Sequence, residues 1–224
     1  MKQTYPTQEV LAYAFAAFRL RGGYVKHTQR YSTEGKPAEH SNGEMVKQHF
    51  GGYTDPDFVD FTTIEEDYEN VELARSHFRR YTLGLIGGQL NSFQQDIFSA
   101  VSNDEIASKQ LGLVAYVPAL VVREIADAKF KKMLRIEYRN SKDIGQPKDV
   151  VDGVIKFLSK FWSEQWESFN YIADYDGNLV SFMNKFDHEV GTRKRIKGKV
   201  KAHGKNRSFD VCETRLNYVK LLKV

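Results

Sequence analysis

The sequence predicts an α+β protein, in which an N-terminal α-helical subdomain is followed by a C-terminal five-stranded β-barrel. Two patterns indicate this order. Apolar residues recur at helical spacing before residue 141, and short segments of alternating apolar and polar residues follow residue 150. A polar stretch with Gly and Pro, Ser141–Asp149, separates the two patterns and predicts a linker. We therefore expect domains over residues 1–145 and 150–224.

The first helix is predicted from about Gln8 to Arg21. Thr7 is its expected N-cap, because a side-chain oxygen at that position accepts a hydrogen bond from a free backbone N–H. Gly22 and Gly23 end the helix, since glycine readily adopts the left-handed conformation found at helix C-termini. The apolar residues of its predicted buried face are Leu11, Ala14, Phe15 and Phe18.

Helical spacing returns after a long polar segment. Residues from about Thr28 to Asp60 are rich in Gly, His and Pro and predict a long loop near 28–60. One face of the next helix carries Val71, Ala74, Phe78 and Tyr81, and that of a second helix carries Leu90, Phe93, Ile97 and Val101. A third helix, capped by Ser102 or Asn103, contains Ile106 and Leu113, and Pro118 is expected to split it from a helix over Leu120–Ile136.

Five β-strands are predicted after the polar stretch. Their approximate ranges are Val151–Ser163, Glu167–Asp174, Asn178–Asn184, Arg193–His203 and Asp210–Leu221. Asp176 and Gly177 separate the second strand from the third, and this dipeptide is a strong signal for a tight hairpin turn. Five short strands fit a small closed barrel, and the OB-like barrel is the common five-stranded type that binds oligonucleotides.

The fourth predicted strand carries the most informative pattern in the chain. Its odd positions are Arg193, Arg195, Lys197, Lys199, Lys201 and His203, and most of its even positions are Ile196, Gly198, Val200 and Ala202. Because successive strand side chains point to opposite faces, the basic residues form a ladder on one side. Their spacing, ~6.6 Å or twice the strand rise, is of the same order as that of phosphates in an extended polynucleotide.

Basic residues are concentrated towards the C-terminus. From Gly191 onward the chain contains eleven Lys or Arg and two acids, a net charge of +9, so residues 1–190 carry −5. Lysines on an exposed strand edge also prevent edge-to-edge pairing, but one or two suffice for that purpose. The longer run here is continued by Lys205, Arg207, Arg215, Lys220 and Lys223, and it favours a polyanionic partner.

Binding of a single strand also requires exposed aromatic rings on which bases stack. Candidates are Trp162, Trp166, Phe169, Tyr171, Phe182 and Tyr218, although strand aromatics more often belong to the core. The odd positions of the first strand include Ile155, Phe157 and Phe161, which are predicted to face the core. Its even positions include Lys156, Lys160 and Trp162, which are predicted to face outwards. Trp162 is therefore the expected stacking residue. The predicted contacts outside the ladder are Lys156, Lys160, Trp162, Trp166, Lys205, Arg207 and Arg215.

Three segments resemble a module found at the ends of assorted bacteriophage-encoded proteins. They are Tyr171–Phe182 (YIADYDGNLVSF), Ile196–His203 (IKGKVKAH) and Glu213–Leu222 (ETRLNYVKLL), and the resemblance covers about Val151–Val224. Such proteins are similar to OB-like single-stranded-DNA-binding proteins or to accessory proteins of replication and recombination. The resemblance implies DNA binding in the cytoplasm of a host cell, and it assigns no family to residues 1–150.

Several classes of site have no support in the sequence. The single cysteine, Cys212, forms neither an internal disulfide nor a cysteine-based zinc site, which is typical of a reducing intracellular compartment. The six histidines are scattered without ligand spacing, so we expect no metal and no cofactor. The N-terminal residues lack a signal-peptide pattern and no apolar run is long enough to span a membrane, so a soluble, cytoplasmic protein without membrane contact is expected.

Two other functions remain open. An acidic cluster suggests Mg²⁺-dependent nuclease chemistry, although acids in a first helical turn are also explained by the helix dipole. Its members are Asp55, Asp57, Asp60, Glu65, Glu66 and Asp67. Alternatively, the helical subdomain docks on a replication, recombination or host enzyme while the basic module binds an acidic protein surface.

No nucleotide-binding loop and no catalytic motif is present in the sequence. We therefore expect a protein that binds single-stranded nucleic acid without sequence specificity and without catalytic residues. DNA is the favoured partner and RNA the alternative.

Overall fold

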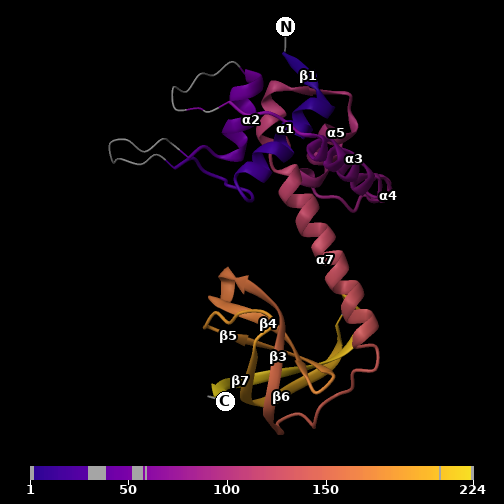
Figure 1. Ribbon diagram of the computed structural model, residues 1–224. Helices are drawn as coiled ribbons and strands as arrows, with labels where there is room; N and C mark the ends of the chain where they lie inside the picture. The colour runs from indigo at the N-terminus through magenta and orange to yellow at the C-terminus, as the bar shows by residue number, and fades with distance from the viewer. Residues whose placement is uncertain (1–2, 30–38, 52–57, 59, 207, 223–224) are drawn as a thin grey trace, which may run out of the picture. The chain divides into compact units, whose positions relative to one another are not determined.

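The computed structural model describes residues 3–29, 39–51, 58, 60–206 and 208–222 (Figure 1). Contacts between residues divide the chain into two compact units, Met1–Ala126 and Asp127–Val224. The division falls inside helix α7 (Val117–Glu137), before the polar stretch at which the composition changes. The first unit is helical and the second contains a β-barrel, which confirms the predicted α+β layout.

The helical unit consists mainly of α-helices. They are α1 (Thr7–Leu20), α2 (Asn42–Gly51), α3 (Glu65–Arg79), α4 (Tyr81–Ile86), α5 (Ser92–Ser102), α6 (Leu111–Val114) and the first part of α7. Two short strands, β1 (Thr4–Pro6) and β2 (Glu105–Ala107), pair in antiparallel fashion. The predicted stop of α1 is confirmed, since Gly22 and Gly23 both have positive φ and Gly23 N–H donates to the carbonyl of Phe18.

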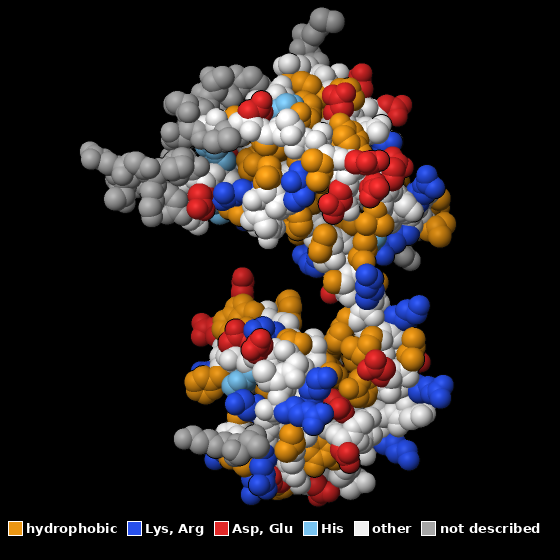
Figure 2. Space-filling view, in the orientation of Figure 1, with side chains coloured by type: hydrophobic (Ala, Val, Ile, Leu, Met, Phe, Trp, Pro, Cys, Tyr) orange, Lys and Arg blue, Asp and Glu red, His pale blue; other side chains and the backbone are white. Residues whose placement is uncertain are grey.

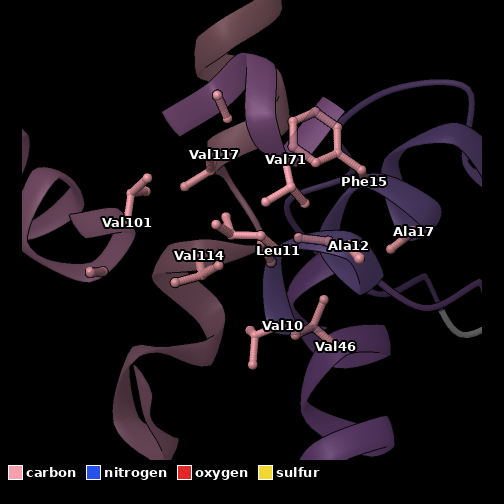
Figure 3. Close-up of a cluster of buried hydrophobic side chains, with 14 of the residues drawn as sticks. Val10, Leu11, Ala12, Phe15, Ala17, Val46, Val71, Val101, Val114 and Val117 are labelled. Carbon is pink, nitrogen blue, oxygen red and sulfur yellow. The ribbon is translucent and has the colours of Figure 1, made fainter. Parts of the chain in front are cut away.

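Helix α1 contributes most of its length to the helical core. Val10, Leu11 and Ala12 are completely buried. Figure 3 shows them among valines of four other helices, namely Val46, Val71, Val101 and Val114. Burial of a side chain of the size of leucine is worth about 1.5–3 kcal/mol, so this cluster is the main source of stability for the unit.

Three local predictions in this unit were wrong. The predicted loop over 28–60 contains α2, which buries Met45 and Val46 in the core and whose buried Asn42 is hydrogen-bonded to Gly23 and Val25, so a short apolar pattern is supplemented by polar anchoring. The N-cap of α1 is Pro6, and Thr7 is already helical. Residues 105–107 pair with β1 instead of continuing a third helix, because tertiary strand pairing overrides local propensity.

Five strands close the barrel in the order β3-β4-β5-β7-β6. They are β3 (Val150–Ser163), β4 (Ser168–Tyr175), β5 (Asn178–Asn184), β6 (Arg193–Asn206) and β7 (Val211–Leu222), each within three residues of its predicted ends. The first half of β3 pairs with β6 and its second half with β4. All neighbouring strands are antiparallel except β5 and β7, which are parallel.

The predicted hairpin turn is confirmed. Asp176 and Gly177 both have positive φ, 50° and 77°, and they connect the paired residues Tyr175 and Asn178. Positive φ at both central residues is the signature of the tight turn whose twist matches that of the flanking strands. This turn fixes the register of β4 against β5, and with it which side chains face outwards.

The barrel interior is filled by alternate residues of all five strands. Phe157 and Tyr171 are completely buried, and their rings lie 4.9 Å apart in an edge-on arrangement. The Tyr171 hydroxyl donates to the carbonyl of Phe186 and accepts from the N–H of His188, both at 2.8 Å. These two bonds attach the connection between β5 and β6 to the core.

The polar stretch that follows α7 belongs to the barrel and is not a free linker. The Ser141 hydroxyl donates to the carbonyl of Cys212 at 2.8 Å and accepts from the N–H of Leu179 at 2.9 Å. It thereby joins β5 to β7 at the start of their short parallel pair. Ile144 packs on the barrel core, and its backbone contacts Thr214 Oγ1 and His203 Nε2.

The last turns of α7 cover part of the outer surface of the barrel. Leu134 and Tyr138 pack in a separate buried cluster with Leu179, Phe209 and Val211. In addition, Arg135 donates a hydrogen bond to the carbonyl of Ser208. The outer face of the sheet is therefore apolar where the helix lies and polar beyond it.

Replacing Ser141 by alanine is expected to destabilise the barrel by about 1–3 kcal/mol, because the buried N–H of Leu179 loses its acceptor. Chemical unfolding followed by circular dichroism measures this change. The exposed Ser76 on α3 provides the matched control, and Ser76→Ala is expected to change stability by less than about 0.5 kcal/mol. Equal unfolding midpoints for the two variants would show that the hydroxyl does not join the strands.

Candidate nucleic-acid interface

The predicted basic ladder on β6 is present over most of its length. Exposed side chains are Arg193, Lys194, Arg195, Lys197, Lys199 and Lys201, and the buried residues between them are Ile196, Gly198 and Val200. Basic side chains therefore face solvent while the apolar residues enter the barrel core. The space-filling view shows Lys and Arg side chains distributed over the barrel unit, and acidic side chains on the helical unit, where α3 carries several (Figure 2).

The alternation ends at a β-bulge between Val200 and Ala202. An extra residue in one strand reverses which side chains face outwards beyond it. As a result His203, predicted to extend the ladder, is half-buried and lies 3.2 Å from the carbonyl of Ile144. Lys205 is exposed and pairs with Asp210 at 3.4 Å, and Arg207 lies outside the described residues.

The basic residues differ in how they are neutralised. Arg195 pairs with Asp152 at 2.9 Å. Arg193 lies opposite Lys156 and shares a pocket of about 320 Å³ with Asp174 and Asp176. By contrast, Lys197, Lys199, Lys201 and Lys220 form no ion pair within the part of the chain that the structure describes. Together with Lys194, which is also exposed and has no ion pair among the described residues, these four lysines are the cations most available to an external anion.

A groove of about 620 Å³ opens on the outer surface of the barrel, beside β6. Strands β5 and β7 pair over three residues, ending at Ser181 and Arg215, and no further pairs hold them together beyond that point in the described strands. The groove is lined by Asn170, Tyr171, Ile172, Ser181, Phe182, Met183, Lys201, Asn206, Glu213, Arg215, Leu216, Asn217 and Tyr218. Two predicted contacts, Lys201 and Arg215, therefore meet at one concave surface.

Tyr218 is the most unusual residue of this groove. It has φ 53° and is 82% exposed, although it lies within a strand. Asn217 pairs with Lys199 and Lys220 pairs with Lys197, so Tyr218 is part of a bulge that faces Gly198. A side chain at Gly198 would come within 2.9 Å of Val219 Cγ2, so the bulge also requires that glycine.

The bulge places an aromatic ring among unpaired lysines. The left-handed conformation costs a residue with a side chain about 1–2 kcal/mol, and such strain is concentrated at functional sites. Sequence reasoning included Tyr218 among possible stacking residues but did not select it. No local pattern in the sequence signals a bulge at this position.

Phe161 does not face the core as predicted, whereas Trp162 is exposed, at 43%, as predicted. A bulge between Phe157 and Ser159 changes the parity of β3 before either residue is reached. Phe161, predicted core, is 71% exposed and lies in the outer row opposite Asn170 and Met183, at the end of the groove. Trp162 pairs instead with Phe169, and their rings lie 4.8 Å apart.

The remaining predicted contacts gather at the open end of the barrel. Lys160 pairs with Asp187 at 2.5 Å and lies over the Phe169 ring. The pKa of Lys160 is raised, mainly because its ammonium group donates a hydrogen bond to Asp187. Trp166 is 63% exposed at the tip of the β3–β4 connection. Burial against Phe157 lowers the pKa of His188 nearby and favours its neutral form.

Among the described members of the acidic cluster, Asp67 is the one buried in the fold. Asp67 is buried and accepts two hydrogen bonds from Arg19 and one from the N–H of Ile64. Glu65 and Glu66 are exposed in the first turn of α3, and Asp55 and Asp57 lie outside the described residues. Among the described residues, no group of three or more His, Cys, Asp or Glu is placed to hold a metal ion.

A second polar cluster connects α7 to α3 and α4. Glu124 accepts hydrogen bonds from Tyr81 at 2.6 Å, from His77 at 2.8 Å and from Arg80. Burial, followed by the hydrogen bond to Glu124, raises the pKa of Tyr81 to about 12. These contacts satisfy Glu124 within the unit and tie the helices together.

Comparisons with protein-family models, curated proteins and solved structures found no match for this chain. None of the described helices has the length and apolar character needed to cross a membrane. The groove and the β6 lysines are therefore interpreted from their own chemistry.

Tyr218→Gly is expected to be more stable than Tyr218→Ala by about 1 kcal/mol. Both changes remove the ring, but alanine keeps the Cβ that is strained at positive φ. Thermal unfolding of the two variants measures the difference directly. An alanine variant at least as stable as the glycine variant would show that the backbone at this position is not strained.

Proposed function

We propose that the barrel binds single-stranded nucleic acid across the groove and along the adjoining lysines of β6, without catalysing a reaction. The observation that supports this most directly is the exposed ring of Tyr218 beside Lys201 and Arg215. Single-strand binding combines these two ingredients, since cations follow the phosphates while aromatic rings stack on bases. DNA is the favoured strand, with replication or recombination as the setting.

The order of the strands supports the same proposal. A five-stranded barrel in which the first strand pairs with both the second and the fourth is compatible with an OB-fold. Proteins of that fold bind oligonucleotides on the face formed by the second and third strands. Here these strands are β4 and β5, and both contribute residues to the groove.

The lysines of β6 supply charge along the path of the strand. Outward side chains on alternate residues are ~6.6 Å apart, which matches an extended backbone. Because Lys197, Lys199 and Lys201 have no ion-pair partner within the described chain, binding a phosphate breaks no existing salt bridge. Their contribution is independent of sequence and is screened by salt.

A second candidate function is protein docking through the helical unit. Helix α4 exposes Leu83 and Ile86 at 78% and 79%, which is unusual for two aliphatic side chains one turn apart. A replication or recombination protein is the proposed partner of this surface. Docking there is compatible with strand binding by the barrel.

Lys199→Gln with Lys201→Gln is expected to weaken binding and to flatten the plot of log K against log salt by about 0.7 for each phosphate that is no longer neutralised. Fluorescence anisotropy with a labelled dT oligonucleotide between 50 and 200 mM salt, about the range in which such effects are large, measures both quantities. The matched control is Lys131→Gln with Lys132→Gln, which removes the same charge from exposed positions on α7. Identical salt slopes for the two double variants would contradict a path along β6.

Tyr218→Gly is expected to weaken strand binding by ~1–3 kcal/mol while the protein stays folded, because the variant has no ring on which a base can stack. Phe161→Ala should act in the same direction, since its ring lies at the end of the groove. Trp162→Ala should instead lower stability and leave the affinity nearly unchanged, because that ring packs on Phe169. Titration of each variant with dT oligonucleotide measures its affinity for the strand. A larger decrease in affinity from Trp162→Ala than from Tyr218→Gly would contradict binding in the groove and would place the strand on the side of β3 where Trp162 lies.

A further inference from the structure

Glu213 is a buried carboxylate within an otherwise cationic groove. Its residue is 4% exposed, yet it lines the groove together with Lys201 and Arg215. A purely phosphate-binding surface has no use for a buried acid, because a carboxylate repels phosphate. The presence of Glu213 therefore calls for a role beyond charge attraction to the backbone.

The hydrogen bonds of Glu213 leave part of its accepting capacity unused. Oε1 accepts from the Ser181 hydroxyl at 2.5 Å, and Oε2 accepts from Asn206 Nδ2 at 2.6 Å. Arg215 Nε lies 3.6 Å from Oε1, which is an ion pair but exceeds hydrogen-bond distance. Since an ionised carboxylate offers about two acceptor sites on each oxygen, one site remains on each.

These contacts also hold the carboxylate in one orientation. Ser181 comes from β5 and Asn206 from the end of β6, so two strands fix the two oxygens independently. A carboxylate held in this way presents a pair of neighbouring acceptors to whatever enters the groove. Its complement is a flat group with two adjacent N–H donors.

We propose that this groove receives a single unstacked guanine, whose N1–H and N2–H₂ donors bind the two free acceptor sites of Glu213. Among the common bases, guanine alone has two adjacent donors on its Watson–Crick edge. Thymine and uracil place a carbonyl on each side of their single N–H donor, and a carboxylate repels those carbonyls. This inference rests on the proposed function and adds a base preference to sequence-independent binding along β6.

The other groove residues fit one face of the base and the phosphate of such a nucleotide. Tyr218 supplies an exposed ring for stacking, and Arg215 and Lys201 lie in the same groove to neutralise the phosphate. The volume of about 620 Å³ is within the range of small-molecule sites, about 300–1,000 Å³, so one nucleotide fits. Neighbouring nucleotides then continue along the lysines of β6.

The test uses full-length protein and dT oligonucleotides that carry one central substitution, dG, dA, dC or deoxyinosine, with affinity measured by fluorescence anisotropy. A single dG should increase affinity about 5- to 100-fold over the unsubstituted oligonucleotide, the range for a bidentate base contact. Inosine lacks the N2 amino group and should show a much smaller increase. In Glu213→Gln the preference for dG should disappear, and the affinity for plain dT should stay the same or rise, because a carboxylate that repels phosphate is removed.

Several outcomes would overturn the inference. Equal affinity of the wild-type protein for the dG, inosine and dT oligonucleotides would reject a guanine site while leaving strand binding intact. A uniform decrease in affinity of Glu213→Gln for all oligonucleotides would show that Glu213 only positions Arg215. If Glu213→Gln fails to fold, the comparison of dG with inosine on the wild-type protein still decides. Absence of binding to every oligonucleotide would reject the proposed function as well.

Discussion

The short parallel contact between β5 and β7 is the constraint on which the rest of the barrel depends. It closes the barrel over three residue pairs, and the Ser141 hydroxyl extends the closure by joining Leu179 to Cys212. A longer pairing would seal the outer surface with backbone hydrogen bonds. Because pairing stops at Ser181 and Arg215, a groove opens that is lined by both apolar and polar side chains. The same feature therefore completes the core on one side and creates the groove, which is the proposed binding surface, on the other.

Bulges then determine which side chains that surface presents. The bulge before Ser159 turns Phe161 outwards and Trp162 towards Phe169. The bulge at Tyr218 directs its ring to solvent, and the one after Val200 takes His203 off the ladder. Each bulge adds one residue to one strand. It therefore exchanges the inward-facing and outward-facing side chains of that strand beyond the bulge, until a second irregularity exchanges them again. The three bulges therefore determine which side chains lie in the proposed interface more than the regular alternation of side chains along the strands does.

Much of the barrel could be predicted from local patterns, but the arrangement of side chains in the proposed binding surface could not. Strand positions, the Asp176–Gly177 turn and the exposed lysines follow from side-chain alternation and turn chemistry, which are properties of neighbouring residues. The roles of Phe161, Tyr218 and Glu213 depend on pairing between strands that are distant in sequence. Helix α2 was missed for a related reason, since Asn42 is held by bonds to residues about twenty positions earlier. Sequence periodicity contains no information on such contacts.

The strained conformation of Tyr218 has a cost in stability that can be compared with the stability of the barrel core. Glycine at position 218 would relieve a cost of about 1–2 kcal/mol, yet the chain has a large aromatic side chain there and a glycine opposite it at Gly198. That cost is small beside the burial of Phe157, Tyr171 and the other core residues, each worth about 1.5–3 kcal/mol. The core therefore tolerates one unfavourable backbone conformation without unfolding. In return, an exposed ring lies at the groove, where the proposed single strand could stack a base on it.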